Sequence, residues 1–365
     1  HEPRENAAFF PLSVDYQEKY AAVGRIPGNF FRRETRLNDY EILISRLVDR
    51  AIRPLFPDGY MHDTQVILTL HSSDQRNLPD AYAALAASAA IVVSDINWNG
   101  PISEVRVAKI NGEYVVNPEK EALEGAELEI IVAATMDNVM MVEGEANECQ
   151  EADLIEAIKV GHEAIKVQCK AQLELAQLVG EAATVKRVLP EAPSSDEALS
   201  LVKEVTTDKI IAVAHGAMDK VTRKDALKAI KTELKEAAAE KGDEWMAEHG
   251  SFISAYFDKH KKATLREVVM SEKVRLDGRA TDQVRPIWTE VDYLPAAHGS
   301  AIFNRGETQA LASLTLGTKL DKKMEDTALA QTYEKFMLHY NFPALSVGEI
   351  KPMRGPGRRE VGHAN

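Results

Sequence analysis

Cysteine is scarce in this sequence, and its scarcity limits how the fold can be stabilised. The 365 residues include two cysteines, Cys149 and Cys169. Two cysteines are too few for a disulfide framework, and their spacing does not match a metal-binding motif. We therefore expect two reduced thiols, buried in a core or lying on a helix face, and a reducing compartment.

Long apolar runs and a net positive charge are also missing. No apolar stretch approaches the roughly 20 residues that a membrane-spanning helix needs, and no basic segment followed by an apolar run opens the sequence. The net charge of −13 argues against a protein that coats nucleic acid through a broad basic surface. We expect a cytoplasmic protein with no membrane partner, in which any contact with nucleic acid is local.

An arginine motif near each end of the chain indicates a duplicated domain. Arg32-Arg33-Glu34 follows a glycine-containing segment, and so does Arg358-Arg359-Glu360. Each motif also comes after a related hydrophobic phrase, at 10–14 in the first case and at 342–347 in the second. Paired guanidinium groups beside flexible glycines suit bidentate contacts with phosphate oxygens. The motif therefore predicts a phosphorylated ligand.

Hydrophobic periodicity predicts an α+β fold in the first half of the chain. Apolar residues at helical spacing indicate helices over 40–53 and 151–178, and Pro54 ends the first of them. Asp80 is expected to cap an alanine-rich helix, and Asn111-Gly112 predicts a hairpin turn. Strand-forming runs cover 64–71, 105–110, 114–116, 128–133 and 139–142.

The composition changes at residues 190–195, which are rich in proline and serine and predict a linker. Beyond the linker, apolar residues keep helical spacing with lysine and glutamate between them. Strand-forming runs return at 289–294 and 310–316. We therefore predict a first domain over 1–185, an all-helical domain over 186–270 and the start of a second domain over 271–365.

The longest distinctive motif is Gly24-Arg25-Ile26-Pro27-Gly28-Asn29-Phe30-Phe31-Arg32-Arg33-Glu34, and it resembles a segment of the bacterial polynucleotide phosphorylases. Members of this family have two tandem ribonuclease PH-like domains joined by an all-helical domain. By this resemblance both ribonuclease PH-like domains are incomplete here, so the sequence is expected to be a piece of a longer protein. The resemblance continues at residues 47–57, 275–279, 298–309 and 357–363.

The resemblance implies a phosphorolytic 3′-to-5′ exoribonuclease that acts in mRNA degradation. Such an enzyme transfers the terminal nucleotide of single-stranded RNA to inorganic phosphate, its co-substrate, and releases a nucleoside diphosphate. The resemblance also implies a homotrimer, in which the arginine loops of three copies surround a pore. A non-catalytic RNA-binding ring subunit or scaffold of the same fold is the alternative, and metal-binding carboxylates distinguish the two.

The predicted RNA-binding residues are Phe30, Phe31, Arg32, Arg33 and Arg36. Aromatic rings stack on bases and arginines pair with phosphates, a combination that suits a sequence-tolerant channel for a single strand. For the two phenylalanines alone, packing in a core is the alternative. An RNA contact and a solvated or carboxylate-paired face both stay open for three helix arginines, Arg46, Arg50 and Arg53.

The predicted catalytic residues come from the second arginine motif. The resemblance places Arg358 and Arg359 at the phosphate groups of the RNA 3′ end, and His363 in contact with the substrate. The assignment of His363 depends on the resemblance, since a lone histidine at the end of a loop is more often structural or solvated.

No metal ligand is predicted within the chain. The family's catalytic copy carries Asp-x5-Asp-x-Lys, whose carboxylates hold Mg²⁺ or Mn²⁺. In the first copy Ile131, Asp137 and Val139 stand at these positions, and 77–80 replaces the serine cluster that binds the attacking phosphate. The metal ligands are therefore expected beyond Asn365, and the polypeptide by itself is expected to bind single-stranded RNA weakly, without phosphorolysis.

Overall fold

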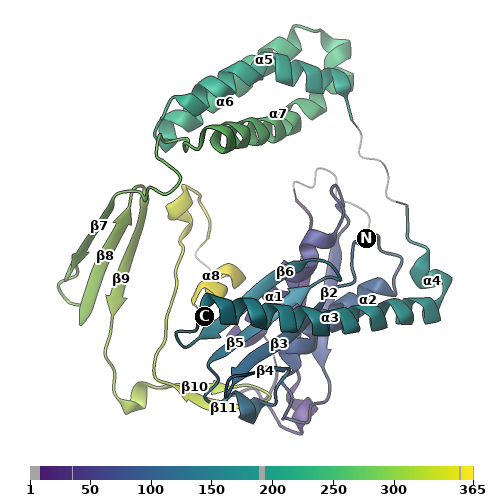
Figure 1. Cartoon of the computed structure of the whole chain (residues 1–365). Helices are drawn as coiled ribbons and strands as arrows, with labels where there is room; N and C mark the ends of the chain where they lie inside the picture. The colour runs from purple at the N-terminus through teal and green to yellow at the C-terminus, as the bar shows by residue number, and fades with distance from the viewer. Residues whose placement is uncertain (1–8, 35, 189–193, 353–354, 365) are drawn as a thin grey trace. The chain divides into compact units, whose positions relative to one another are not determined.

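The computed structural model describes residues 9–34, 36–188, 194–352 and 355–364. The chain divides into two compact units, which are considered one at a time (Figure 1). The first unit combines His1–Pro190 with Gly317–Asn365, and the second unit is Glu191–Leu316. The linker predicted at 190–195 lies mostly outside the described residues.

The first unit contains a four-stranded antiparallel sheet and a separate parallel strand pair. In the four-stranded sheet, Asn111 and Gly112 have φ values of 52° and 81°, the left-handed geometry of a tight hairpin turn. The predicted hairpin is therefore confirmed. The strand order is β4-β3-β5-β6, formed by β3 (Ser103–Ile110), β4 (Glu113–Val116), β5 (Leu128–Ala134) and β6 (Val139–Ala146), and β1 (Leu12–Glu18) pairs with β2 (Thr64–Leu70).

Two helices of the first unit confirm their sequence predictions closely. Helix α1 (Asp39–Ile52) begins with a capping box, in which the side chains of Asn38 and Glu41 each accept the other's backbone N–H. Helix α3 (Glu151–Val179) lies on the four-stranded sheet. A Cβ at Gly161 of α3 would lie only 3.0 Å from Val107 of the sheet, so this glycine permits the close approach of helix and strand.

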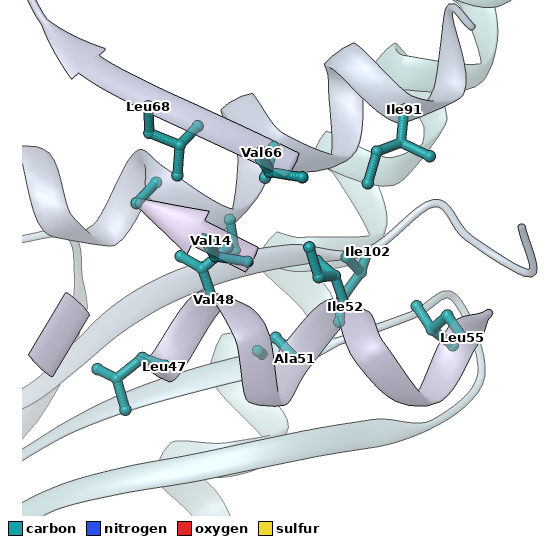
Figure 2. Close-up of a cluster of buried hydrophobic side chains, with 14 of the residues drawn as sticks. Val14, Leu47, Val48, Ala51, Ile52, Leu55, Val66, Leu68, Ile91 and Ile102 are labelled. Atoms are coloured by element: carbon teal, nitrogen blue, oxygen red, sulfur yellow. The ribbon is translucent and has the colours of Figure 1, made fainter. Parts of the chain in front are cut away.

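The main core of the first unit lies where α1, the parallel strand pair and α2 (Ala83–Val92) meet. Figure 2 shows Val14 and Val66 from the strands facing Val48 and Ile52 from α1. Val48 and Ile52 are fully buried, as is Ile102 beside them. Each such side chain contributes about 1.5–3 kcal/mol relative to exposure, so this cluster fixes the position of α1 against β1.

The prediction that Asp80 caps an α-helix is wrong. Asp80 lies within a 3₁₀ turn, Pro79–Tyr82, that precedes α2, and its side chain is buried. Its carboxylate accepts a hydrogen bond from Tyr40 Oη at 2.8 Å and pairs with Arg106. A buried carboxylate needs a charged partner, and Arg106 supplies it from the neighbouring sheet.

The second unit contains three helices followed by a three-stranded sheet. The helices pack around buried apolar residues such as Val202, Leu234 and Phe257, which confirms the predicted helical run. Among the helices that the structure describes, none is long and apolar enough to cross a membrane. The elements are α5 (Asp196–His215), α6 (Lys220–Ala239), α7 (Asp243–Glu272), β7 (Ile287–Val291), β8 (Gly299–Arg305) and β9 (Thr308–Leu314).

Candidate functional site

The first arginine motif lies on a loop whose two ends are held together. A 3₁₀ turn, Tyr20–Val23, ends at Gly24, whose φ of 70° is left-handed. The loop then leaves the turn and returns at Glu34, whose carboxylate accepts the backbone N–H of Tyr20 at 2.8 Å and pairs with Lys19 at 2.8 Å. Residues 24–34 therefore form a closed loop with a fixed base.

Arg25 attaches the base of this loop to a distant hairpin of the same unit. The hairpin is formed by β10 (Lys323–Asp326) and β11 (Gln331–Glu334). The Arg25 guanidinium donates to the carbonyl of Thr327 and to the Asp326 carboxylate, each at 2.7 Å. Tyr20 Oη donates to the Asp326 carbonyl at 2.6 Å. Sequence reasoning missed this contact, because the partners lie about 300 residues apart.

The tip of the loop presents two aromatic rings and two arginines together. Phe30 is 93% exposed and Phe31 78% exposed, and their rings meet edge to face at 5.3 Å. Packing in a core, the alternative for this pair, is therefore wrong for the described structure. Arg32 and Arg33 are exposed beside the rings, as is Arg36, and none of the three has an ion-pair partner among the described residues.

The second arginine motif is preceded by the same turn. The 3₁₀ turn Ala344–Val347 ends at Gly348, whose φ is also 70°. Its counterpart in the first copy is Tyr20–Val23, whereas the predicted counterpart, 10–14, leads into strand β1. The predicted correspondence between 10–14 and 342–347 is therefore wrong, because these similar residues form part of a strand in the first copy and a turn in the second.

The second motif then forms a short helix, α8 (Arg358–Ala364), that lies beside α1 (Figure 1). The Arg358 guanidinium donates to the Val14 carbonyl at 2.6 Å and pairs with Asp15. Arg359 is exposed. Burial favours a higher pKa for Asp15, but hydrogen bonds led by that from Arg358 outweigh it and lower the pKa.

His363 is exposed at the end of α8, where its ring lies 5.2 Å from that of Tyr340. The structure thus brings Arg358, Arg359 and His363 onto one short helix. Within the described part of the chain, no hydrogen bond or ion pair joins this helix to the loop that carries Phe30.

Two of the three helix arginines are paired with carboxylates. Arg50 pairs with Glu143, and Arg53 pairs with Asp49 at 2.6 Å. Arg46 lies against α8, where a Cβ added at Gly362 would collide with its guanidinium. For Arg50 and Arg53 the carboxylate-paired alternative is confirmed.

A cluster of buried acids lies in the first unit, and sequence reasoning missed it. Glu104 is fully buried, and its carboxylate oxygens have no hydrogen-bond partner among the described residues. Burial raises the pKa of Glu104 to about 8, with the Asp80 carboxylate adding to the effect and Arg106 opposing it. Burial also raises the pKa of Glu18, at the end of β1, to about 7. The signal in the sequence was the position of Glu104 within the apolar strand β3, whose neighbouring residues are buried.

The positions that correspond to metal ligands in the resembled family do not form a metal site in this copy. Ile131 is buried within β5, and Val139 begins β6. Asp137 lies in the exposed turn between these strands. In the described ranges of the chain, no three His, Cys, Asp or Glu side chains are grouped so that they could hold a metal ion.

Three family models match this chain. The model described as 3′ exoribonuclease family, domain 1, matches residues 1–97 and 283–365. The model described as 3′ exoribonuclease family, domain 2, matches 100–164. Between them, the model of the polyribonucleotide nucleotidyltransferase RNA binding domain matches 198–280. Domain 1 is thus matched twice, on either side of the helical region, as the repeated motif predicted.

Curated relatives with the name polyribonucleotide nucleotidyltransferase match nearly the whole chain. The relative from Bacteroides fragilis is 54% identical over 358 residues, which is 98% of this chain and 50% of the relative. That from Parabacteroides distasonis is 54% identical over 98% of this chain and 47% of the relative. That from Cytophaga hutchinsonii is 50% identical over the whole chain and 50% of the relative. The chain therefore spans about half the length of these relatives.

Proposed function

Because this chain belongs to the polyribonucleotide nucleotidyltransferase family, we propose that it forms part of the core of a phosphorolytic 3′-to-5′ exoribonuclease. The reaction converts RNA and inorganic phosphate into an RNA shorter by one nucleotide and a nucleoside diphosphate. We propose that this reaction takes place in cytoplasmic mRNA degradation. We also propose that the chain has the predicted domains 1–185, 186–270 and 271–365. The observation that carries the proposal is the exposed tip of the first loop, where two aromatic rings and two arginines stand together.

The loop tip suits a single RNA strand of any sequence. Every base has a face that can stack on Phe30 or Phe31, and one stacked base contributes about 1–3 kcal/mol. Arg32 and Arg33 supply cations for the backbone phosphates, which carry no sequence information. Tight binding in this acidic chain requires such a local cluster, since its net charge of −13 repels RNA as a whole.

The helix α8 suits the 3′ end of the strand. Arg359 is exposed and can pair with a phosphate directly. Arg358 is paired with Asp15, so it can contact a phosphate either while it keeps this ion pair or after it breaks it. His363 contacts the Tyr340 ring and is exposed, so it is able to contact a substrate. In this proposal Arg358 and Arg359 orient the terminal phosphodiester towards the attacking inorganic phosphate.

A divalent metal, Mg²⁺ or Mn²⁺, belongs to the proposed reaction by family resemblance. In an in-line phosphoryl transfer such an ion neutralises developing charge. The described residues do not fit it, because Ile131 and Val139 provide no ligand, and no three His, Cys, Asp or Glu side chains among the described residues are grouped so that they could hold an ion. We therefore assign no metal ligand among the described residues and derive no step through the metal.

A homotrimer is proposed as the assembly. Cyclic symmetry would bring three Phe30–Arg33 tips around one axis, so that a single strand passing along the axis meets all of them. Light scattering on the purified protein checks this proposal. A mass three times that of the chain supports the trimer, and a mass of one chain at all concentrations contradicts it.

The activity is tested by incubating the natural full-length protein with oligoadenylate, Mg²⁺ and inorganic phosphate, and measuring ADP. The proposal predicts ADP release that stops when phosphate is omitted. RNA binding without phosphate-dependent ADP release favours the alternative, a non-catalytic RNA-binding ring subunit or scaffold. If the protein neither binds RNA nor releases ADP, both functions are contradicted.

A further inference from the structure

The second unit contains a pocket of about 770 Å³. It lies where the start of α6 meets the segment 275–286 and the turn between β8 and β9. This volume falls within the range of small-molecule sites. Its lining is unusually cationic for an acidic chain, because it includes six cations, Lys220, Arg223, Arg275, Arg279, Arg285 and Arg305.

Three of these cations maintain the wall of the pocket. Arg223 donates to the Met218 carbonyl at 2.9 Å, and Arg275 donates to the Thr281 carbonyl at 2.6 Å. Arg279 pairs with a carboxylate of the same loop at 3.0 Å. The last two contacts hold the 275–286 segment in a definite shape, and a second hydrogen bond from Arg223, to the Leu276 carbonyl at 3.4 Å, joins this segment to α6. The pocket therefore has a formed wall.

The other three cations are available to a ligand. Lys220, Arg285 and Arg305 have no ion-pair partner in the part of the chain that the structure describes. They come from three different elements, the first turn of α6, the segment before β7 and the end of β8. Gly306, with a φ of 62°, turns the chain between β8 and β9, and a Cβ at this position would lie 3.3 Å from the Arg285 side chain.

The acidic residues of the lining do not cancel this charge. The four acids are Asp219, Asp277, Asp282 and Glu307, against six cations. Two of the four are already engaged: Asp219 caps α6 by accepting backbone N–H groups at 2.9 and 3.0 Å, and Asp277 pairs with Arg279. The unengaged charge in the pocket is therefore positive.

We propose that this pocket binds a small anion with two linked phosphate groups, such as pyrophosphate or the diphosphate of a nucleotide. Three separated cations suit a ligand with several phosphate oxygens better than they suit a single monovalent anion. None of the described lining residues is aromatic, so the pocket offers no ring on which a base could stack, and recognition rests on the phosphates. The site is distinct from the two arginine motifs and goes beyond the function proposed above.

Hydrogen exchange and calorimetry on the whole chain test the proposal with pyrophosphate, ADP and oligoadenylate as probes. Pyrophosphate and ADP are expected to bind with similar affinity and to slow amide exchange in 275–286 and 305–308. The double variant Arg285→Gln with Arg305→Gln is expected to lose this protection and to bind pyrophosphate at this site at least about tenfold more weakly. Arg305→Lys, which keeps the charge, is expected to lose less.

The matched control removes the same charge from exposed positions outside the pocket, as Lys235→Gln with Lys262→Gln. It should bind and protect like the unaltered protein. Unchanged protection of 275–286 in the Arg285 and Arg305 double variant would overturn the proposal, as would no protection by pyrophosphate in the unaltered protein. Protection by oligoadenylate alone would also overturn it, and would indicate an RNA contact instead. None of these measurements depends on catalytic activity, so they test the pocket independently of the proposed reaction.

Discussion

The turns before the two arginine motifs have nearly the same backbone, yet the segments after them follow different paths. Gly24 has φ and ψ of 70° and 22°, and Gly348 has 70° and 24°. The residue after each glycine donates its N–H to the first residue of the 3₁₀ turn at 3.0 Å. The first copy then extends into an exposed loop, and the second leads to α8, packed beside α1. Local sequence sets the turn, whereas distant partners determine the path of the chain beyond it.

The partners explain the difference. In the first copy the residue after the glycine is Arg25, which binds the β10–β11 hairpin. In the second copy it is Glu349, which forms an ion pair with its neighbour Lys351 instead. One arginine motif is therefore displayed at the tip of an anchored loop, and the other is held against β1 through Arg358. In the function proposed above, the first motif contacts the RNA strand and the second contacts its 3′ end.

The largest expected effect concerns the buried acids of the first unit. Burial raises the pKa of Glu104 from 4.5 to about 8, so the folded state binds the proton more tightly than the unfolded state. Stability should therefore fall as pH rises from about 4.5 to 8, and level off above. Glu104→Gln should stabilise the protein by a few kcal/mol at pH 9 and have no effect below pH 4.

Urea unfolding at a series of pH values measures this effect. The matched control is Glu113→Gln, which alters an exposed acid at the end of a neighbouring strand. A constant difference between Glu104→Gln and the unaltered protein from pH 4 to pH 9 would show that the Glu104 carboxyl does not titrate as described.

Removal of the aromatic rings should have the next largest effect. Phe30→Ala with Phe31→Ala removes two stacking surfaces, each worth about 1–3 kcal/mol per base, and oligoadenylate affinity should fall at least tenfold. The melting temperature should not change, because both rings are exposed. The matched control, Leu320→Ala with Phe336→Ala, removes two other exposed apolar side chains of the first unit. Equal losses of affinity in the two double variants would contradict a stacking role.

Breaking the Arg25 contact should weaken RNA binding moderately. Arg25→Ala frees the base of the loop from Asp326, so that RNA must order the loop on binding. Since the pair is partly exposed, we expect a loss of about 1 kcal/mol, or about fivefold in Kd. Asp326→Ala should give a similar loss, and the double variant little more than either alone. Fully additive losses would show that the two side chains act separately.

An effect of similar size is expected at the two glycine turns themselves. A Cβ at Gly24 or Gly348 would meet no atom within 4 Å, so alanine at either position costs only the left-handed backbone, about 1–2 kcal/mol. Urea unfolding should show similar losses for Gly24→Ala and Gly348→Ala. Oligoadenylate binding should weaken more in Gly24→Ala than in Gly348→Ala, because the first turn carries the exposed loop with both aromatic rings, whereas the second leads only to the contacts proposed for the 3′ end. Equal weakening in both variants would remove the functional contrast between the copies.

Features that depend on nearby residues were predictable from the sequence. Helix α1 follows from the spacing of its own apolar residues, and the hairpin at Asn111 follows from its two turn residues. Features set by distant partners were not. Asp80 was predicted as a cap, but Arg106 draws it into a buried pair, and the Arg25 contact depends on a hairpin about 300 residues away. For Phe30 and Phe31 the sequence left core packing open, and their exposure in the folded chain excludes it.

The salt dependence of RNA binding tests most directly whether the first arginine motif holds the RNA backbone. In a single strand each phosphate contact contributes about 0.7 to the slope of log affinity against log salt concentration. Arg32→Ala with Arg33→Ala should therefore make the slope for oligoadenylate shallower by about 1.4, and should weaken binding to other homopolymers equally. The control Lys262→Ala with Arg266→Ala, exposed residues of α7, should leave the slope unchanged. An unaltered slope in the Arg32 and Arg33 variant would contradict the assignment of this loop to RNA.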